Sequence, residues 1–448
     1  MLNKEAAERL RQWGQSHPGA VIWALAFVAC IPGLWALLPS FDVDPDMIYV
    51  APTIMSYGVG DLYRLFTEPA PWGDGSYRPF VFLMWWFEGA IFGDYAPGWG
   101  FVSWLMGVAC AALTGLITLR VSGSQMAALT ATLLVSLRQS TSWQLPDFLT
   151  AVVGALLLLV SIWWLFERVR KRRIADALAT SLSGLGILWV LIHVEWVFQD
   201  WVPWYVGGLT CLQGAVLHLG LAHLAWRYAD FGRPGTLAAF WGLWGVMAWS
   251  YEQPLCLPLA MAPAFLITVP RSNWHRALTL LLGAVALTAG YVAVRWYLLQ
   301  LHGMTEYQAT QLRSGSIWLL DILRYTFPPA EIVGLVWCWT SPVALLVGGA
   351  SWRTIALILA WLWAYALPLM RHKQLAVLYW WKIIAYLPLA RFHPHPHYLY
   401  LPQLAAAAMH GVLVAYWYPT ARASFKPAGT DEPVDGQSRE LRTDESIH

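Results

Sequence analysis

The sequence predicts an all-α, polytopic transmembrane helical bundle, and its composition is the first reason. Of 448 residues, 58% are hydrophobic and only 12% are charged, whereas an ordinary soluble domain has roughly 25% charged residues. A soluble fold of this size could not hide so much apolar surface, because folded domains still expose much of theirs. Soluble enzymes, disordered scaffolds and fibrous proteins are therefore excluded.

The second reason is that the apolar residues occur in runs close to the length of a membrane-spanning helix, about 20 residues. These runs predict about 11 to 13 spans. Pro254 and Pro258 separate two runs that form either a hairpin or one broken helix. The candidate spans are 20–39, 99–119, 124–138, 148–166, 176–195, 204–226, 236–251, 253–269, 276–298, 329–349, 353–370, 375–390 and 400–418.

Basic residues between the runs predict the orientation in a cytoplasmic (inner) membrane. Residues 168–173 form the densest basic cluster, and positively charged loops stay in the cytoplasm. If the spans alternate, Arg120, Arg227 and Arg271 lie on the same cytoplasmic side. The side of 371–373 stays open, since its charge favours the cytoplasm whereas strict alternation of the runs places it outside.

Three parts follow from this arrangement. Residues 1–19 form a cytoplasmic amino terminus, and the first run is a retained helix because no convincing cleavage site follows it. Residues 20–420 form the transmembrane domain. Residues 421–448 are polar without an apolar face, which predicts a disordered tail.

Two outer loops interrupt the transmembrane domain, at 40–97 and 299–328. The first is too apolar to be disordered. Its segments Ile48–Leu65 and Phe80–Phe92 have the pattern of helices that lie on the membrane or dip into it.

The net charge of +2 is too small to indicate nucleic acid as a partner. The five cysteines lie far apart within apolar runs, so we expect neither disulfides nor a zinc site. Thirty tryptophans fit a protein with many helix ends at the membrane interface. Stacking of some of them on sugar rings is the less favoured interpretation.

An acidic turn follows the first span and contains Asp42, Asp44 and Asp46. Three carboxylates at a membrane surface repel one another, which is costly unless they meet a cation or an incoming hydroxyl. One of them could serve as a general base, or the cluster could bind a divalent cation, Mg²⁺ or Mn²⁺, through oxygen ligands. The alternative is a solvated turn that begins a helix at Asp44-Pro45.

Two further segments place charge at helix ends. Arg78, in Tyr77-Arg78-Pro79, suits a phosphate through two parallel hydrogen bonds, although a single arginine more often reaches lipid headgroups. Glu252 ends an apolar run, at a depth where an ionisable side chain usually faces a cavity or a partner.

The last polar segment runs from Arg391 through His393, His395 and His397 to Tyr398. Histidines at every second residue of an extended segment could point the same way. No acidic or cysteine ligand lies beside them, so we assign no metal here and favour donation to a phosphate.

In their order, these motifs resemble the GT-C superfamily of integral-membrane glycosyltransferases, especially its O-mannosyltransferase-like and tetratricopeptide-associated branch. The resemblance covers residues 20–418, and its most specific elements are the Tyr-Arg-Pro and Tyr-Leu-Tyr-Leu-Pro motifs. The matching segments are the acidic turn, Leu62–Phe66, Tyr77–Phe80, Phe92–Gly98, Ser250–Leu255 and Tyr398–Pro402. The sequence departs from the family at His397, where relatives usually have arginine.

The resemblance implies transfer of a sugar from a polyprenyl-phosphate donor to an acceptor, a protein or a glycan, outside the cytoplasmic membrane. It implies a base among the three acids, with Asp44 and Asp46 preferred over Asp42. It further implies that Arg78 and the Arg391–Tyr398 segment, with His397, hold the lipid phosphate beside Tyr77, and that Glu252 lines the cavity. Two alternatives stay open: a catalytically divergent subunit of a membrane assembly, with membrane proteins as partners, and a transporter or flippase of a lipid-linked substrate.

Overall fold

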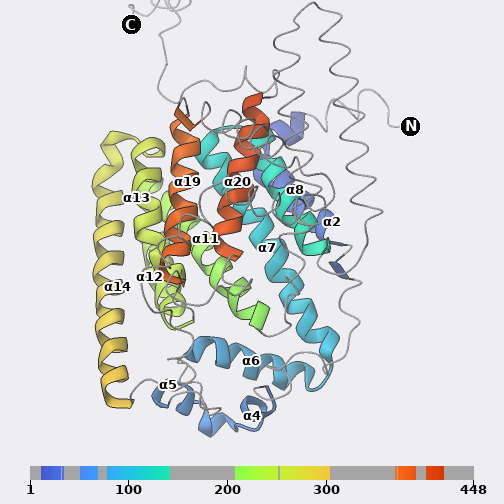
Figure 1. Ribbon diagram of the computed structural model, residues 1–448, viewed down its shortest axis with the longest axis vertical. Helices are drawn as coiled ribbons and strands as arrows, with labels where there is room; N and C mark the ends of the chain where they lie inside the picture. The colour runs from blue at the N-terminus through green and yellow to red at the C-terminus, as the bar shows by residue number, and fades with distance from the viewer. Residues whose placement is uncertain are drawn as a thin grey trace, which may run out of the picture.

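The computed structural model describes residues 12–31, 33–34, 51–68, 78–141, 207–250, 253–302, 369–370, 372–389 and 400–417, and every regular element within these ranges is a helix (Figure 1). This confirms the predicted all-α class. The elements are α2 (Pro18–Cys30), α4 (Ala51–Met55), η3 (Val59–Asp61), α5 (Arg64–Thr67), α6 (Pro79–Phe92), α7 (Ala96–Ser122), α8 (Gln125–Thr141), α11 (Gly207–Phe231), α12 (Pro234–Ala248), η4 (Gln253–Cys256), α13 (Leu257–Thr268), η5 (Arg271–Asn273), α14 (Trp274–His302), α19 (Lys373–Tyr386), η6 (Leu387–Leu389) and α20 (Tyr400–Trp417).

The described helices coincide with the apolar runs of the sequence. Pro254 lies in the one-turn helix η4 and Pro258 at the start of α13, so the runs on either side of them form separate helices. The predicted spans 148–166, 176–195 and 329–349, and nearly all of 353–370, lie outside the described residues.

Proline and glycine set many of the boundaries. Proline occupies one of the first two positions of α2, α6, α7, α12 and α13, where its missing N–H costs nothing. Gly93, Gly123 and Gly232 have positive φ angles and follow the ends of α6, α7 and α11. Glycine adopts this left-handed conformation without a steric penalty, and so it ends the helix.

Among the residues that the structure describes, two helical segments are long and apolar enough to cross a membrane, Ala96–Ser122 and Arg271–Tyr297. Four shorter apolar helices accompany them: Pro18–Cys30, Pro79–Phe92, Gln125–Ser136 and Leu257–Thr268. Length and composition thus favour a membrane protein, and the number of spans stays a prediction.

Helix α7 is the centre of the bundle and packs against α2, α8, α11 and α20. Small residues permit the closest approaches. A methyl group on Gly115 would lie 2.0 Å from Oγ1 of Thr132 in α8, and one on Gly411 of α20 would lie 2.3 Å from the carbonyl oxygen of Ala127. Helices that approach this closely gain packing contacts along their backbones.

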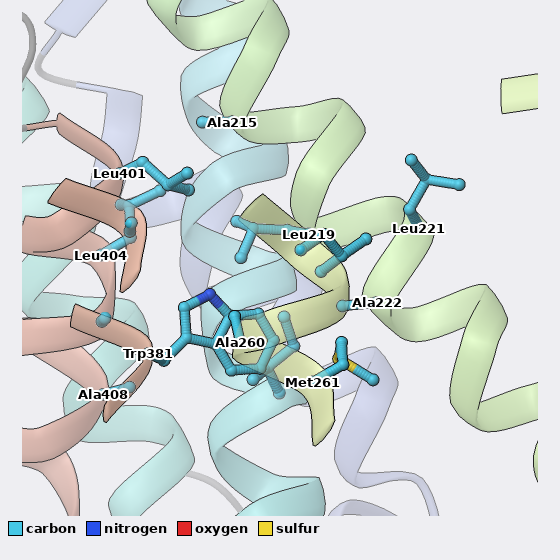
Figure 2. Packing of buried hydrophobic residues seen from close by; sticks show 14 of the residues in the cluster. Ala215, Leu219, Leu221, Ala222, Ala260, Met261, Trp381, Leu401, Leu404 and Ala408 are labelled. Atoms are coloured by element: carbon cyan, nitrogen blue, oxygen red, sulfur yellow. The ribbon is translucent and has the colours of Figure 1, made fainter. Parts of the chain in front are cut away.

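The core continues between α11, α13, α19 and α20 (Figure 2). Figure 2 shows the indole of Trp381 beside Ala260 and Met261. The indole N–H of Trp381 donates to Nε2 of His218 on α11 at 2.9 Å. This bond satisfies a buried polar group in an otherwise apolar layer.

One end of the bundle, which we call the basic end, collects the arginines that the sequence predicts on a common side. Arg120 at the end of α7 forms an ion pair with Asp230 at 2.7 Å and donates to the carbonyl of Thr268 at 3.2 Å. Arg276 of α14 donates to the carbonyl of Asp230 at 3.3 Å. These bonds join the ends of α7, α11 and α13 to the start of α14.

The basic end also includes the start of α19. The ring of His372 lies 4.5 Å from that of Tyr416, near the end of α20. That part of α20 packs on Ala127 in the first turn of α8, which follows α7 at the basic end. His372 and Lys373 therefore lie at the same end of the bundle as Arg120, and the membrane side of this end stays a prediction.

We predict that Gly411→Ala destabilises the protein by about 1–3 kcal/mol, because the added methyl group meets the backbone of α8, which cannot yield as a side chain would. The midpoint of thermal unfolding in detergent measures this. Gly245→Ala is the matched control, since a methyl group there meets nothing within 4 Å. Equal midpoints for the two variants would contradict the close contact.

Candidate functional site

Helix α6 lies across the end of the bundle opposite the basic end, and we call this the α6 end (Figure 1). With 14 residues it is about 21 Å long, too short to cross a bilayer. It packs against α4, α5 and α7. The helix predicted at Phe80–Phe92 is thus present. The segment predicted at Ile48–Leu65 contains α4 and η3, and α5 begins within it and ends at Thr67.

The start of α6 is joined to the end of α12. The backbone N–H of Phe80 donates to the carbonyl of Trp249 at 3.3 Å. Arg78 is the residue before α6, and its Nε atom is buried. Ser250 is 1% exposed and donates to the carbonyl of Val246 at 2.6 Å. Residues 78–80 and 249–250, far apart in the sequence, therefore lie next to each other at the α6 end.

The one-turn helix η4, which follows Ser250, contacts α11, α12, α19 and η6. Helix η6 ends at Leu389, and α20 begins at Tyr400, which belongs to the Tyr-Leu-Tyr-Leu-Pro motif. Tyr400 is 1% exposed, and its hydroxyl is hydrogen-bonded to the thiol of Cys110 on α7.

A buried carboxyl group lies on α6 at Glu88, a residue that the sequence analysis did not single out. Glu88 is 3% exposed, and neither of its carboxyl oxygens has a hydrogen-bond partner among the residues that the structure describes. Burial away from water disfavours the charged form and raises the pKa of Glu88 from 4.5 to about 8. Near neutral pH the carboxyl group is therefore mostly protonated, and it can both donate and accept a hydrogen bond.

Trp85 lies one helical turn before Glu88, on the same face of α6. It is 4% exposed, and its indole nitrogen is buried with no hydrogen-bond acceptor within the described ranges. The neighbouring Trp86 differs, because its indole N–H donates to the carbonyl of Tyr57 at 2.8 Å. Trp86 thus uses its indole N–H in a structural hydrogen bond, whereas the indole N–H of Trp85 has no acceptor among the described residues.

Lys382 adds a cation one turn before the end of α19. It is 2% exposed and follows Trp381, whose indole binds His218. Two buried glutamines lie in the first turns of α11 and α20, Gln213 and Gln403. A lysine is seldom buried to this extent without a charge or a polar ligand close by.

In the sequence, Glu88 and Lys382 stand out only because each is a single charged residue within an apolar run. Glu88 is the one charged residue in Pro79–Phe92, and Lys382 stands alone within Gln374–Tyr386. A single charge within an apolar run is a sign of a functional position when the run lies in a membrane.

Several predicted site residues lie outside the described residues: Asp42, Asp44, Asp46, Tyr77, Glu252, Arg391, His397 and Tyr398. Of the predicted set, the structure places Arg78. Within the described ranges, no group of three or more His, Cys, Asp or Glu side chains could hold a metal ion. The predicted cation position at Asp44 and Asp46 stays a prediction.

Comparison with known proteins yields no match: no protein-family model, no curated protein and no solved structure is similar to this chain.

We predict that the buried carboxyl makes the stability of the protein fall as pH rises. Between pH 4.5 and about 8 the folded state keeps the proton of Glu88 and the unfolded state has lost it, so folding takes up a proton. The stability advantage of Glu88→Gln should be absent below about pH 4.5 and reach on the order of 4 kcal/mol by about pH 8.

Unfolding of the two proteins at several pH values measures this difference. Glu68→Gln is the control. Glu68 is an exposed carboxylate directly after α5, which packs on α6, and its ion pair with Arg64 contributes little to stability. A difference between Glu88→Gln and the unmodified protein that does not change with pH would contradict the prediction.

Proposed function

We propose that this chain is a multi-pass membrane glycosyltransferase of the inner membrane, which transfers a sugar from a polyprenyl-phosphate donor to an acceptor outside the cytoplasm. The observation that carries the proposal is the contact between Phe80 and Trp249, which joins two of the motif segments next to buried ionisable groups. The basic end, on the opposite side of the bundle, would face the cytoplasm.

In this proposal the cations Arg78 and Lys382 bind the phosphate of the donor. Arg78 precedes α6, and Lys382 lies one turn before the end of α19. Negative charge develops on the phosphate as the sugar leaves, and cations fixed at that point lower the barrier. Arg391 and His397 would add to this set, and Glu252 and Tyr77 would line the cavity, as the motif resemblance implies.

The chemical step needs a base. A carboxylate of the acidic turn, Asp44 or Asp46 in preference to Asp42, takes the proton of the acceptor hydroxyl. The hydroxyl oxygen then bonds to the anomeric carbon of the sugar. The bond from that carbon to the phosphate oxygen breaks, and polyprenyl phosphate leaves with the electron pair. Asp44 and Asp46 also offer the oxygen ligands that Mg²⁺ or Mn²⁺ prefers.

Release of free polyprenyl phosphate from a panel of polyprenyl-phosphate sugars tests the proposal. The purified protein should turn over one of them, and the double variant Asp44→Ala/Asp46→Ala should lose at least about 100-fold in kcat, the usual size of a general-base contribution. Lys382→Met should mainly raise KM for the donor, because it removes a charge that contacts the donor equally in the ground state and in the transition state.

Glu68→Ala serves as the control, since it removes an exposed carboxylate outside the proposed site. Absence of turnover with every donor, in protein with a normal unfolding midpoint, would favour a non-catalytic subunit of a membrane assembly. Passage of the intact donor across vesicles without bond cleavage would favour a transporter or flippase.

A further inference from the structure

Two buried polar groups of α6 face the same direction and make no hydrogen bond within the part of the chain that the structure describes. They are the carboxyl oxygens of Glu88 and the indole nitrogen of Trp85. Both side chains are more than nine-tenths buried and lie three residues apart on one helical face. An unsatisfied buried polar group destabilises a fold. Two of them, side by side, indicate that something other than the described residues satisfies them.

The hydrogen-bonding capacity of the pair defines the ligand. The indole donates one hydrogen bond, and a neutral carboxyl group donates one and accepts others. A phosphate or carboxylate ligand would be repelled whenever Glu88 ionises. A hydroxyl group both donates and accepts, and adjacent hydroxyls on a sugar ring match two such positions.

Helix α4 forms part of the cover over Trp85, which also packs in a cluster with Leu65 and Trp99. Helix α4 has five residues and packs on α6 where Gly89 follows Glu88. A methyl group on Gly89 would lie 2.4 Å from Cγ of Met55, so the flexible side chain of Met55 lies directly on α6. Methionine changes conformation easily, which allows a ligand to replace it.

We propose that Trp85 and Glu88 bind the hydroxyl groups of the sugar carried by the donor. This inference rests on the proposed function and deepens it: the sugar lies against α6, and the phosphate lies at Arg78 and Lys382. The two residues select a neutral, hydroxyl-rich group, whereas Arg78 and Lys382 select the anion.

Binding of two probes by the full-length protein in lipid nanodiscs tests the inference. The first probe is a set of citronellyl-phosphate sugars with different hexoses and a pentose, and the second is citronellyl phosphate without a sugar. Affinities are measured by calorimetry at about pH 6, where Glu88 is protonated. The unmodified protein should bind one sugar-bearing probe more tightly than the sugar-free probe.

Adjacent tryptophans supply a matched pair of variants. Trp85→Phe should weaken binding of the sugar-bearing probe about 5- to 10-fold, leave the sugar-free probe unchanged and leave the unfolding midpoint unchanged or higher. Trp86→Phe should lower the midpoint, because the carbonyl of Tyr57 loses its donor, and leave both affinities unchanged. Equal effects of the two variants on the sugar-bearing probe would overturn the inference.

Substitutions of Glu88 separate binding from a structural role. Glu88→Leu should raise the midpoint of the ligand-free protein and weaken the sugar-bearing probe at least about 10-fold, since it removes an unsatisfied group that the ligand needs. Glu88→Gln keeps a donor and an acceptor and should retain most of the affinity. A Glu88→Leu variant with a lower midpoint, or with unchanged sugar affinity, would overturn the inference.

The outcome also distinguishes this inference from the proposed function. Tight, Glu88-dependent binding of a sugar-bearing probe without any transfer would refute catalysis and leave the hydroxyl site standing. Transfer from a lipid-linked donor with equal affinity for both probes would support the function and overturn the hydroxyl site.

Discussion

Close backbone packing around α7 is the interaction on which the rest of the structure depends. At Gly115 and Gly411 the helices approach one another so closely that even a methyl group has no room. In a membrane there is no water to expel, so association depends on contacts of this kind. Helix α7 also connects the two ends of the molecule: Trp99 in its first turn belongs to the core under α6, and Arg120 in its last turns is bonded to Asp230.

Polar groups at the two ends of the bundle differ in whether they have hydrogen-bond partners among the described residues. At the basic end, Asp230 accepts from Arg120 through its side chain and from Arg276 through its carbonyl, and these bonds hold helix ends together. At the α6 end, Glu88 and Trp85 are buried at a cost that no described residue offsets. A protein that retains such a cost gives up stability at that position, as binding sites often do. This contrast is the physical basis for placing the site at the α6 end.

Much of the fold could be predicted from the sequence, because the signals are local. Runs of apolar residues near bilayer length predict helices, and proline and glycine mark where several of them begin and end. The crosswise helix Pro79–Phe92 was also predictable, since 14 apolar residues are too few to span a bilayer. The site could be predicted only in part. The contact of Phe80 with Trp249 joins residues far apart in sequence, and the burial of Glu88 depends on the tertiary packing of α6, so neither leaves a periodic signal.

Helix α14 has a consequence for how this protein must be handled. Only 22% of its most apolar 18-residue window is buried, and Leu282, Val285 and Trp296 are among the side chains that face outward. Its attachment relies on specific contacts, such as Gly283 against Trp241 and the bond from Arg276. Solubilisation therefore replaces the lipid along a helix about 40 Å long with detergent. A detergent that displaces the contact of Gly283 with Trp241 would detach α14 first, and the loosening of α14 would report the quality of the preparation before the core around α7 unfolds.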